Sequence, residues 1–107
     1  VPGITAVDAA GHSPGLLAFH IESSGKRIVI SADTFTQYVM AVQRPEWHFE
    51  MDDDKDKAVA TRKRMLDMLT ADKLFVAGFH MPFPGIGFVE IGQGGYRWVP
   101  HSYQLNL

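Results

Sequence analysis

Three polar residues follow segments expected to form strands, and their types are those of metal ligands. His12 comes after the first expected strand, Asp33 after the third, and His80 after the apolar segment 74–79. Loops at strand ends often carry binding groups, because the sheet beneath them fixes their positions. Imidazole nitrogens and carboxylate oxygens bind zinc and related divalent ions at about 2 Å. The three residues are therefore candidate metal ligands.

Other roles for these residues stay open at this point, because no local motif fixes their spacing. Each could instead cap a helix, form a turn or be a hydrogen-bonded buried side chain. The remaining histidines are weaker candidates: His20 alternates with hydrophobic neighbours, His48 lies in an expected loop, and His101 is expected at the surface. The acidic run 52–56 lacks the glycine and distal glutamate of an EF-hand calcium loop, so helix capping is the better interpretation.

The hydrophobic pattern predicts three strands, an irregular segment, one helix and three further strands. Residues 34–50 have no clean periodicity, and the apolar run 28–30 is typical of a strand covered on both faces. One helix cannot cover both faces of a six-stranded sheet, so we expect a partner layer from outside the sequence. The expected strands are 4–7, 16–21, 27–30, 73–79, 88–91 and 96–99, and the expected helix is about 54–70.

The composition and charge of the chain exclude several classes of binding site and argue against some partners. At 107 residues and 46% hydrophobic content the chain fits one domain. The net charge is -2 and basic residues form no run, which argues against a nucleic-acid partner. Cysteine is absent, which excludes disulfides, thiolate metal sites and a thiol nucleophile. No apolar stretch reaches the roughly 20 residues of a membrane span, so we expect a soluble chain without a membrane partner, cytoplasmic or periplasmic.

Several short motifs occur together in a recognisable order. "GHSPG" precedes a strand and a glycine hairpin, "SAD" ends an apolar strand, and "GFH" is followed by "PFPGIG". Over residues 7 to 100 the chain resembles the C-terminal half of metallo-β-lactamase-fold hydrolases. "FHMPFPGIG" and "GGYRWVP" look most like the methyl parathion hydrolase branch. The resemblance implies an α+β fold: residues 1–107 as a single unit, one half of a four-layer αββα sandwich, with a mixed sheet and one main helix.

The resemblance also implies a binuclear metal site. His12 would bind the first of two divalent ions, expected to be zinc, and His80 the second. Asp33 would bridge both ions and be the catalytic residue of this chain. A hydroxide shared by the two ions would attack a small-molecule ester, lactone, β-lactam or phosphotriester.

One part of the family pattern is missing. The signature His-x-His-x-Asp-His is absent, so four of the seven implied ligands lie outside this sequence. A catalytic zinc needs three protein ligands, so we expect weak or no metal binding and little activity from this chain alone. The complete site would require an N-terminal half, from the same or a separate chain. The alternative is a non-catalytic half-domain or assembly module that forms a homo-oligomer or pairs with a separate N-terminal chain.

Overall fold

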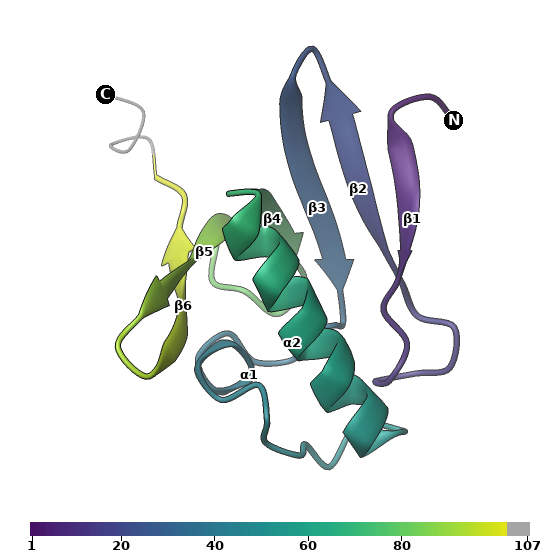
Figure 1. Ribbon diagram of the computed structural model, residues 1–107, viewed down its shortest axis with the longest axis vertical. Coiled ribbons are helices and arrows are strands. Elements are labelled where there is room, and N and C mark those ends of the chain that lie inside the picture. Colours follow the sequence, from purple (N-terminus) through teal and green to yellow (C-terminus); the bar gives the residue numbers. More distant parts are fainter. Residues whose placement is uncertain (103–107) are drawn as a thin grey trace.

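A mixed sheet of six strands forms the framework of the molecule, and one long helix lies across it (Figure 1). The computed structural model describes residues 1–102. The predicted order of the strands and the main helix is confirmed, and one short helix falls inside the segment that lacked periodicity. The elements are β1 (Ile4–Asp8), β2 (Leu17–Ser23), β3 (Lys26–Ala32), α1 (Met40–Gln43), α2 (Lys55–Ala71), β4 (Phe75–Gly78), β5 (Ile86–Gly92) and β6 (Gly95–Pro100).

Neighbouring strands in the sheet are consecutive in the sequence, and all but one pair are antiparallel. Ser24 and Gly25 join β2 to β3 with positive φ angles of 53° and 76°, the type I′ geometry that suits the twist of a hairpin. Strand β4 instead pairs parallel with β3. A parallel pair cannot be joined by a tight turn, so the chain crosses over the sheet through α1 and α2.

Acidic residues stabilise the beginning of α2. The side chain of Asp54, the N-cap residue, accepts a hydrogen bond from the backbone amide of Lys57 at 3.0 Å. Such a cap contributes about 1 kcal/mol, and Asp56 in the first turn interacts favourably with the helix dipole. The capping interpretation is confirmed for Asp54. Within residues 1–102, no helix is both long and apolar enough to cross a membrane.

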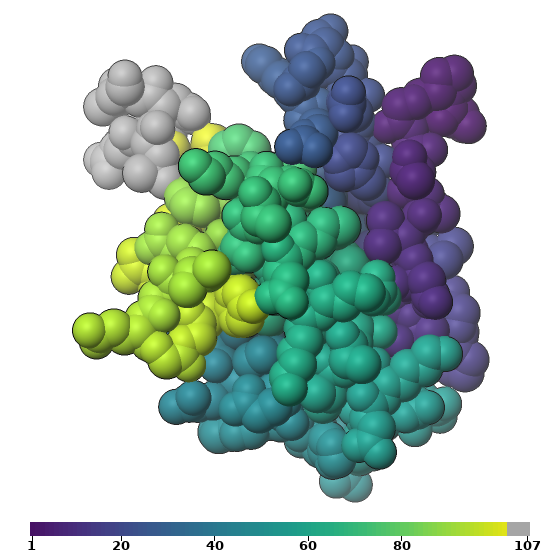
Figure 2. Space-filling view, in the orientation of Figure 1, coloured from purple at the N-terminus to yellow at the C-terminus, as the bar shows by residue number. Residues whose placement is uncertain are grey.

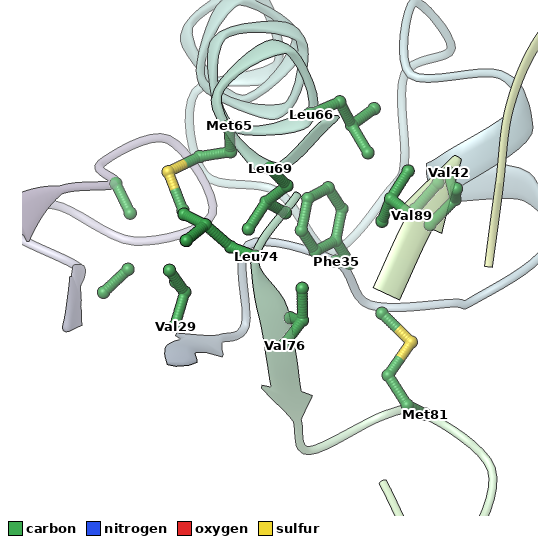
Figure 3. Packing of buried hydrophobic residues seen from close by; sticks show 13 residues of the cluster. Val29, Phe35, Val42, Met65, Leu66, Leu69, Leu74, Val76, Met81 and Val89 are labelled. Atoms are coloured by element: carbon green, nitrogen blue, oxygen red, sulfur yellow. The ribbon is translucent and has the colours of Figure 1, made fainter. Parts of the chain in front are cut away.

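The hydrophobic core lies between α2 and one face of the sheet (Figure 3). Met65, Leu66 and Leu69 of α2 are fully buried and form one cluster with Val29 of β3 and Val76 of β4. Burying each such side chain stabilises the fold by about 1.5–3 kcal/mol. Figure 2 shows α2 lying over the sheet on the face toward the viewer. The cluster is completed by Ala9, Ala18, Phe35, Ala41, Val42, Leu74, Met81 and Val89.

The opposite face of the sheet is apolar and only partly covered. Phe19, Ile30 and Ala77 form one row across three strands, and Phe75 lies in the next row. The exposed fractions of Phe19 and Phe75 are 36% and 42%. The expectation that β3 is covered on both faces is therefore met on the helix face only, within the part of the chain that the structure describes.

A hydrogen bond between Tyr96 and Asp67 joins β6 to α2. The Tyr96 hydroxyl donates to Asp67 Oδ1. This bond, together with burial and the negative charge of Asp67, raises the pKa of Tyr96 above its usual value of about 10. Because the folded state holds the phenol proton more tightly, the stabilisation is complete below pH 10. It is lost as the pH rises through the folded-state pKa.

We predict that Tyr96→Phe lowers the free energy of unfolding by about 1 kcal/mol at neutral pH, because it removes this hydrogen bond. The difference from the unmodified protein should shrink as the pH rises above about 10. Urea unfolding at neutral and alkaline pH measures both effects. Tyr38→Phe is the control, and a Tyr96→Phe difference that stays constant with pH would contradict the assignment.

Candidate metal centre

Strand direction brings the three candidate ligands to one edge of the sheet. Strands β1 and β3 both pair antiparallel with β2, and β4 is parallel to β3, so β1, β3 and β4 run in the same direction. His12 lies in the loop after β1, Asp33 follows β3, and His80 follows β4. Residues that follow the carboxyl ends of strands running the same way lie at the same edge. Residues far apart in sequence therefore meet because of the sheet topology.

Asp33 lies between the two histidines and contacts each through a different oxygen. Its Oδ2 atom is 3.6 Å from His12 Nε2, and its Oδ1 atom is 3.1 Å from His80 Nε2. The exposed side-chain fractions are 22% for His12, 36% for Asp33 and 47% for His80. The cluster is thus open to a molecule approaching from solvent.

An irregularity in β3 orients Asp33. The register between β3 and β4 shifts between Ile30 and Ala32, and Ala32 has a φ angle of 49°. Alanine in this left-handed region costs roughly 1 kcal/mol, and such bulges redirect the side chains that follow them. Thr34 closes the turn, since its backbone amide and its hydroxyl both donate to the Ser31 carbonyl, at 3.1 and 2.7 Å. Asp33 therefore lies in a turn that these two hydrogen bonds to the Ser31 carbonyl close.

The loop that carries His12 is docked on the beginning of α2. The backbone amides of Asp53 and Asp54 donate to the carbonyls of His12 and Gly11, at 3.1 and 2.9 Å. Gly11 has a φ angle of 146°, and a Cβ atom at this position would overlap the backbone of Ala58. A side chain at position 11 would push the loop away from the helix. Glycine at position 11 therefore lets the loop that carries His12 lie directly against α2.

A buried ion pair supports His12 from the other side. The Nδ1 atom of His12 is 3.1 Å from Asp52 Oδ1, and Asp52 Oδ2 is 2.7 Å from Arg62 Nη1. The helix-capping interpretation is wrong for Asp52, because its carboxylate is buried and contacts His12 and Arg62. Sequence reasoning missed this pair. The available signal was Arg62 itself, which lies one helical turn from Ala58 and from Leu66 on the buried face of α2.

The other three histidines have contacts of their own. His20 is inside β2, paired with Thr5 and Val29. His48 contacts the exposed Asp56 at 3.0 Å, and the His101 ring packs against the edge of Phe75 with a centroid distance of 5.6 Å. None of these contacts involves the cluster around Asp33.

The cluster has the donor types of a metal site without forming a complete one. Across residues 1–102, no group of three or more histidine, aspartate or glutamate side chains is arranged to hold a metal ion. His12 and His80 instead form two separate pairs with Asp33. Donors bound to one tetrahedral zinc lie about 3.4 Å apart, which is close to the 3.6 Å between His12 Nε2 and Asp33 Oδ2. The shorter distance, 3.1 Å between His80 Nε2 and Asp33 Oδ1, is that of a direct hydrogen bond.

Several solved structures of known proteins have a fold similar to that of this chain. No family model and no curated protein matches the sequence. AidC, a dizinc quorum-quenching lactonase solved with a product, N-hexanoyl-L-homoserine, is 34% identical with a TM-score of 0.88, over 94% of this chain and 34% of AidC. AbOPH, a hydrolase of the β-lactamase superfamily, is 32% identical with a TM-score of 0.89, over 96% of this chain and 36% of AbOPH. The mixed six-stranded sheet and main helix of this chain match one half of the metallo-β-lactamase fold.

A third structure agrees with this fold. A probable metal-dependent hydrolase from Staphylococcus aureus is 25% identical with a TM-score of 0.68, over 95% of this chain and 37% of the other. The predicted α+β class with one main helix is thus confirmed. The resemblance is confirmed for the superfamily of the structural neighbours, while the methyl parathion hydrolase branch stays a prediction. The chain spans about a third of the length of each of these proteins.

We predict that Gly11→Ala destabilises the protein by about 1–3 kcal/mol, because the added methyl group overlaps α2. Gly15→Ala in the same loop is the matched control. Gly15 also has a positive φ angle, 74°, but its Cβ position is open, so only backbone strain of about 1 kcal/mol is expected. Urea unfolding compares the two, and equal losses would contradict the docking role of Gly11.

Proposed function

We propose that this chain is the C-terminal portion of a binuclear metal-dependent hydrolase. His12 would bind the first metal ion, His80 the second, and Asp33 would bridge the two. The observation that supports this most directly is the orientation of the Asp33 carboxylate. Its two oxygens face two different imidazole rings, those of His12 and His80. A carboxylate that bridges two ions needs this arrangement. The likeness to a dizinc lactonase, AidC, supports the same proposal.

The donor set favours zinc among the divalent ions. Imidazole nitrogens and a carboxylate suit zinc, and the lack of cysteine excludes thiolate-only sites. Two bound ions would supply a strong nucleophile at neutral pH by lowering the pKa of a shared water, and would polarise the substrate oxygen. His12, Asp33 and His80 would hold and space the ions. No nucleophilic side chain of this chain is then required.

The proposed substrate is a small ester, lactone, β-lactam or phosphotriester. A lactone is favoured among these by the likeness to AidC. A phosphotriester follows if the chain belongs to the methyl parathion hydrolase branch. The exposed aromatic rings of Phe79 and Phe83, on either side of His80 in the sequence, suit an apolar group on the substrate.

The remaining ligands would come from the part of the domain that this chain does not span. The apolar row of Phe19, Ile30 and Ala77 on the open face of the sheet suits the same partner, because a second sheet could pack there. This face also favours the alternative function, a non-catalytic half-domain that covers the face with a copy of itself or with a separate N-terminal chain.

Metal content tests the hydrolase proposal. The protein that contains this chain should hold about two metal ions per chain by plasma emission, and Asp33→Ala should lose them together with about 100-fold or more of lactone or phosphotriester hydrolysis. Asp53→Ala removes an exposed carboxylate of the neighbouring loop and should change neither. Retention of both metal ions and activity by Asp33→Ala would overturn the role of Asp33. Absence of metal from the unmodified protein would favour the half-domain alternative.

Substitution on the open face tests whether it is covered in the complete protein. Phe19→Asp should destabilise the protein by more than 2 kcal/mol if a partner layer buries the position, because a charge would then be desolvated. Ile91→Asp is the control, since Ile91 is 74% exposed and should change stability by about 0.5 kcal/mol or less. Denaturant unfolding gives both values. Equal, small effects would contradict a covered face in either proposed function.

A further inference from the structure

Asp52 is the most deeply buried carboxylate near the cluster, and both of its oxygens have defined partners. The exposed fraction of its side chain is 0%, against 36% for Asp33. Oδ1 lies 3.1 Å from His12 Nδ1, and Oδ2 lies 2.7 Å from Arg62 Nη1. An ionised carboxylate accepts hydrogen bonds and donates none, so the hydrogen bond to His12 requires a proton on Nδ1.

Arg62 holds Asp52 in this orientation and is itself fixed. Besides Asp52, its guanidinium donates to the carbonyls of Pro45 and Trp47, at 3.2 and 2.6 Å. Its Cζ atom also lies 4.8 Å from the centre of the Phe49 ring. Each guanidinium nitrogen therefore has a partner, and only 1% of the residue is exposed. Neither Arg62 nor Asp52 can rotate without leaving a buried polar group unpaired.

Stability alone does not account for this arrangement. A buried ion pair loses its hydration, and a pair of packed apolar side chains of similar volume stabilises a fold as well or better. What an apolar pair could not do is accept the proton of His12 Nδ1. With that proton placed, Nε2 carries the free electron pair, and Nε2 is the atom that faces Asp33 Oδ2. Two acceptor atoms then face each other across 3.6 Å, an arrangement that suits a cation between them.

We propose that Asp52, anchored by Arg62, is a positioning residue that fixes the tautomer and ring orientation of His12, so that Nε2 is presented to a metal ion beside Asp33. This proposal rests on the hydrolase function proposed above, which supplies the metal ion. The tautomer of His12 is inferred from the geometry of this chain alone. Of the two candidate histidine ligands, His12 alone has a buried carboxylate behind its ring among the described residues. Among the described residues, the hydrogen bond and ion pair of His80 are both with Asp33, and no buried carboxylate plays the part of Asp52 for it.

Asp52→Asn is a sharp test because it keeps the shape of the side chain. The amide oxygen would stay on the charged Arg62, which donates only, and the amide nitrogen would then face His12 Nδ1 and donate to it. His12 should therefore change to the tautomer with its proton on Nε2. The matched control is Asp53→Asn, since Asp53 is exposed and contacts His12 through its backbone amide alone.

The first readout is independent of metal and of activity. Nitrogen-15 shifts of labelled histidine are recorded on the metal-free protein at about pH 9, where ordinary imidazoles are neutral, and His12 is assigned with a His12→Gln variant. We expect a proton on Nδ1 in the unmodified protein and in Asp53→Asn, and on Nε2 in Asp52→Asn. A proton on Nε2, or an equal mixture, in the unmodified protein would overturn the proposal even if Asp52→Asn does not fold.

The second readout is zinc affinity, measured by titration of the complete protein that contains this chain and of its Asp52→Asn and Asp53→Asn variants. We expect Asp52→Asn to weaken binding of one ion about 10–100-fold and to leave the other, held through His80, within about 3-fold. Equal weakening of both ions, or of neither, would overturn the positioning role. If the unmodified protein binds no zinc while His12 carries its proton on Nδ1, the hydrolase function fails and the metal-directed role of Asp52 fails with it. The tautomer assignment alone would survive that result.

Discussion

The parallel pairing of β3 with β4 is the constraint on which the rest of the structure depends. Two parallel neighbours cannot be joined by a short turn, so the chain has to travel back along the sheet. The returning segment is where α2 forms, and α2 supplies Met65, Leu66 and Leu69 to the hydrophobic core. The same pairing brings Asp33 and His80 to one edge. One topological feature thus produces the core on one face and the polar cluster at the end of the strands.

The local features of the chain could be predicted from the sequence. Both hairpins and α2 are determined over short distances, by glycine turns, by a capping aspartate and by an apolar face of period 3.6. The three candidate ligands could also be named, because each follows an expected strand. Helix α1 could not be predicted, since four residues are too few to display a helical period.

The support of His12 could not be predicted, for a physical reason. A carboxylate just before a helix is ordinarily a cap, and Asp54 two residues later is one. Asp52 differs only in what surrounds it in three dimensions, including a histidine 40 residues away in the sequence. The role of Arg62 could not be predicted either, because an arginine on an amphipathic helix commonly extends its charge to solvent. Here the helix, the loop before it and Phe49 enclose the charge instead.

The open apolar face of the sheet has a consequence for how the chain behaves in dilute and concentrated solution. A surface that includes Phe19 and Phe75 is stabilised by whatever removes it from water. Where a separate chain covers that face, stability is linked to mass action, and folding and assembly are then coupled equilibria. The melting temperature of such an assembly would then depend on the concentrations of both chains, and a single value would not describe it.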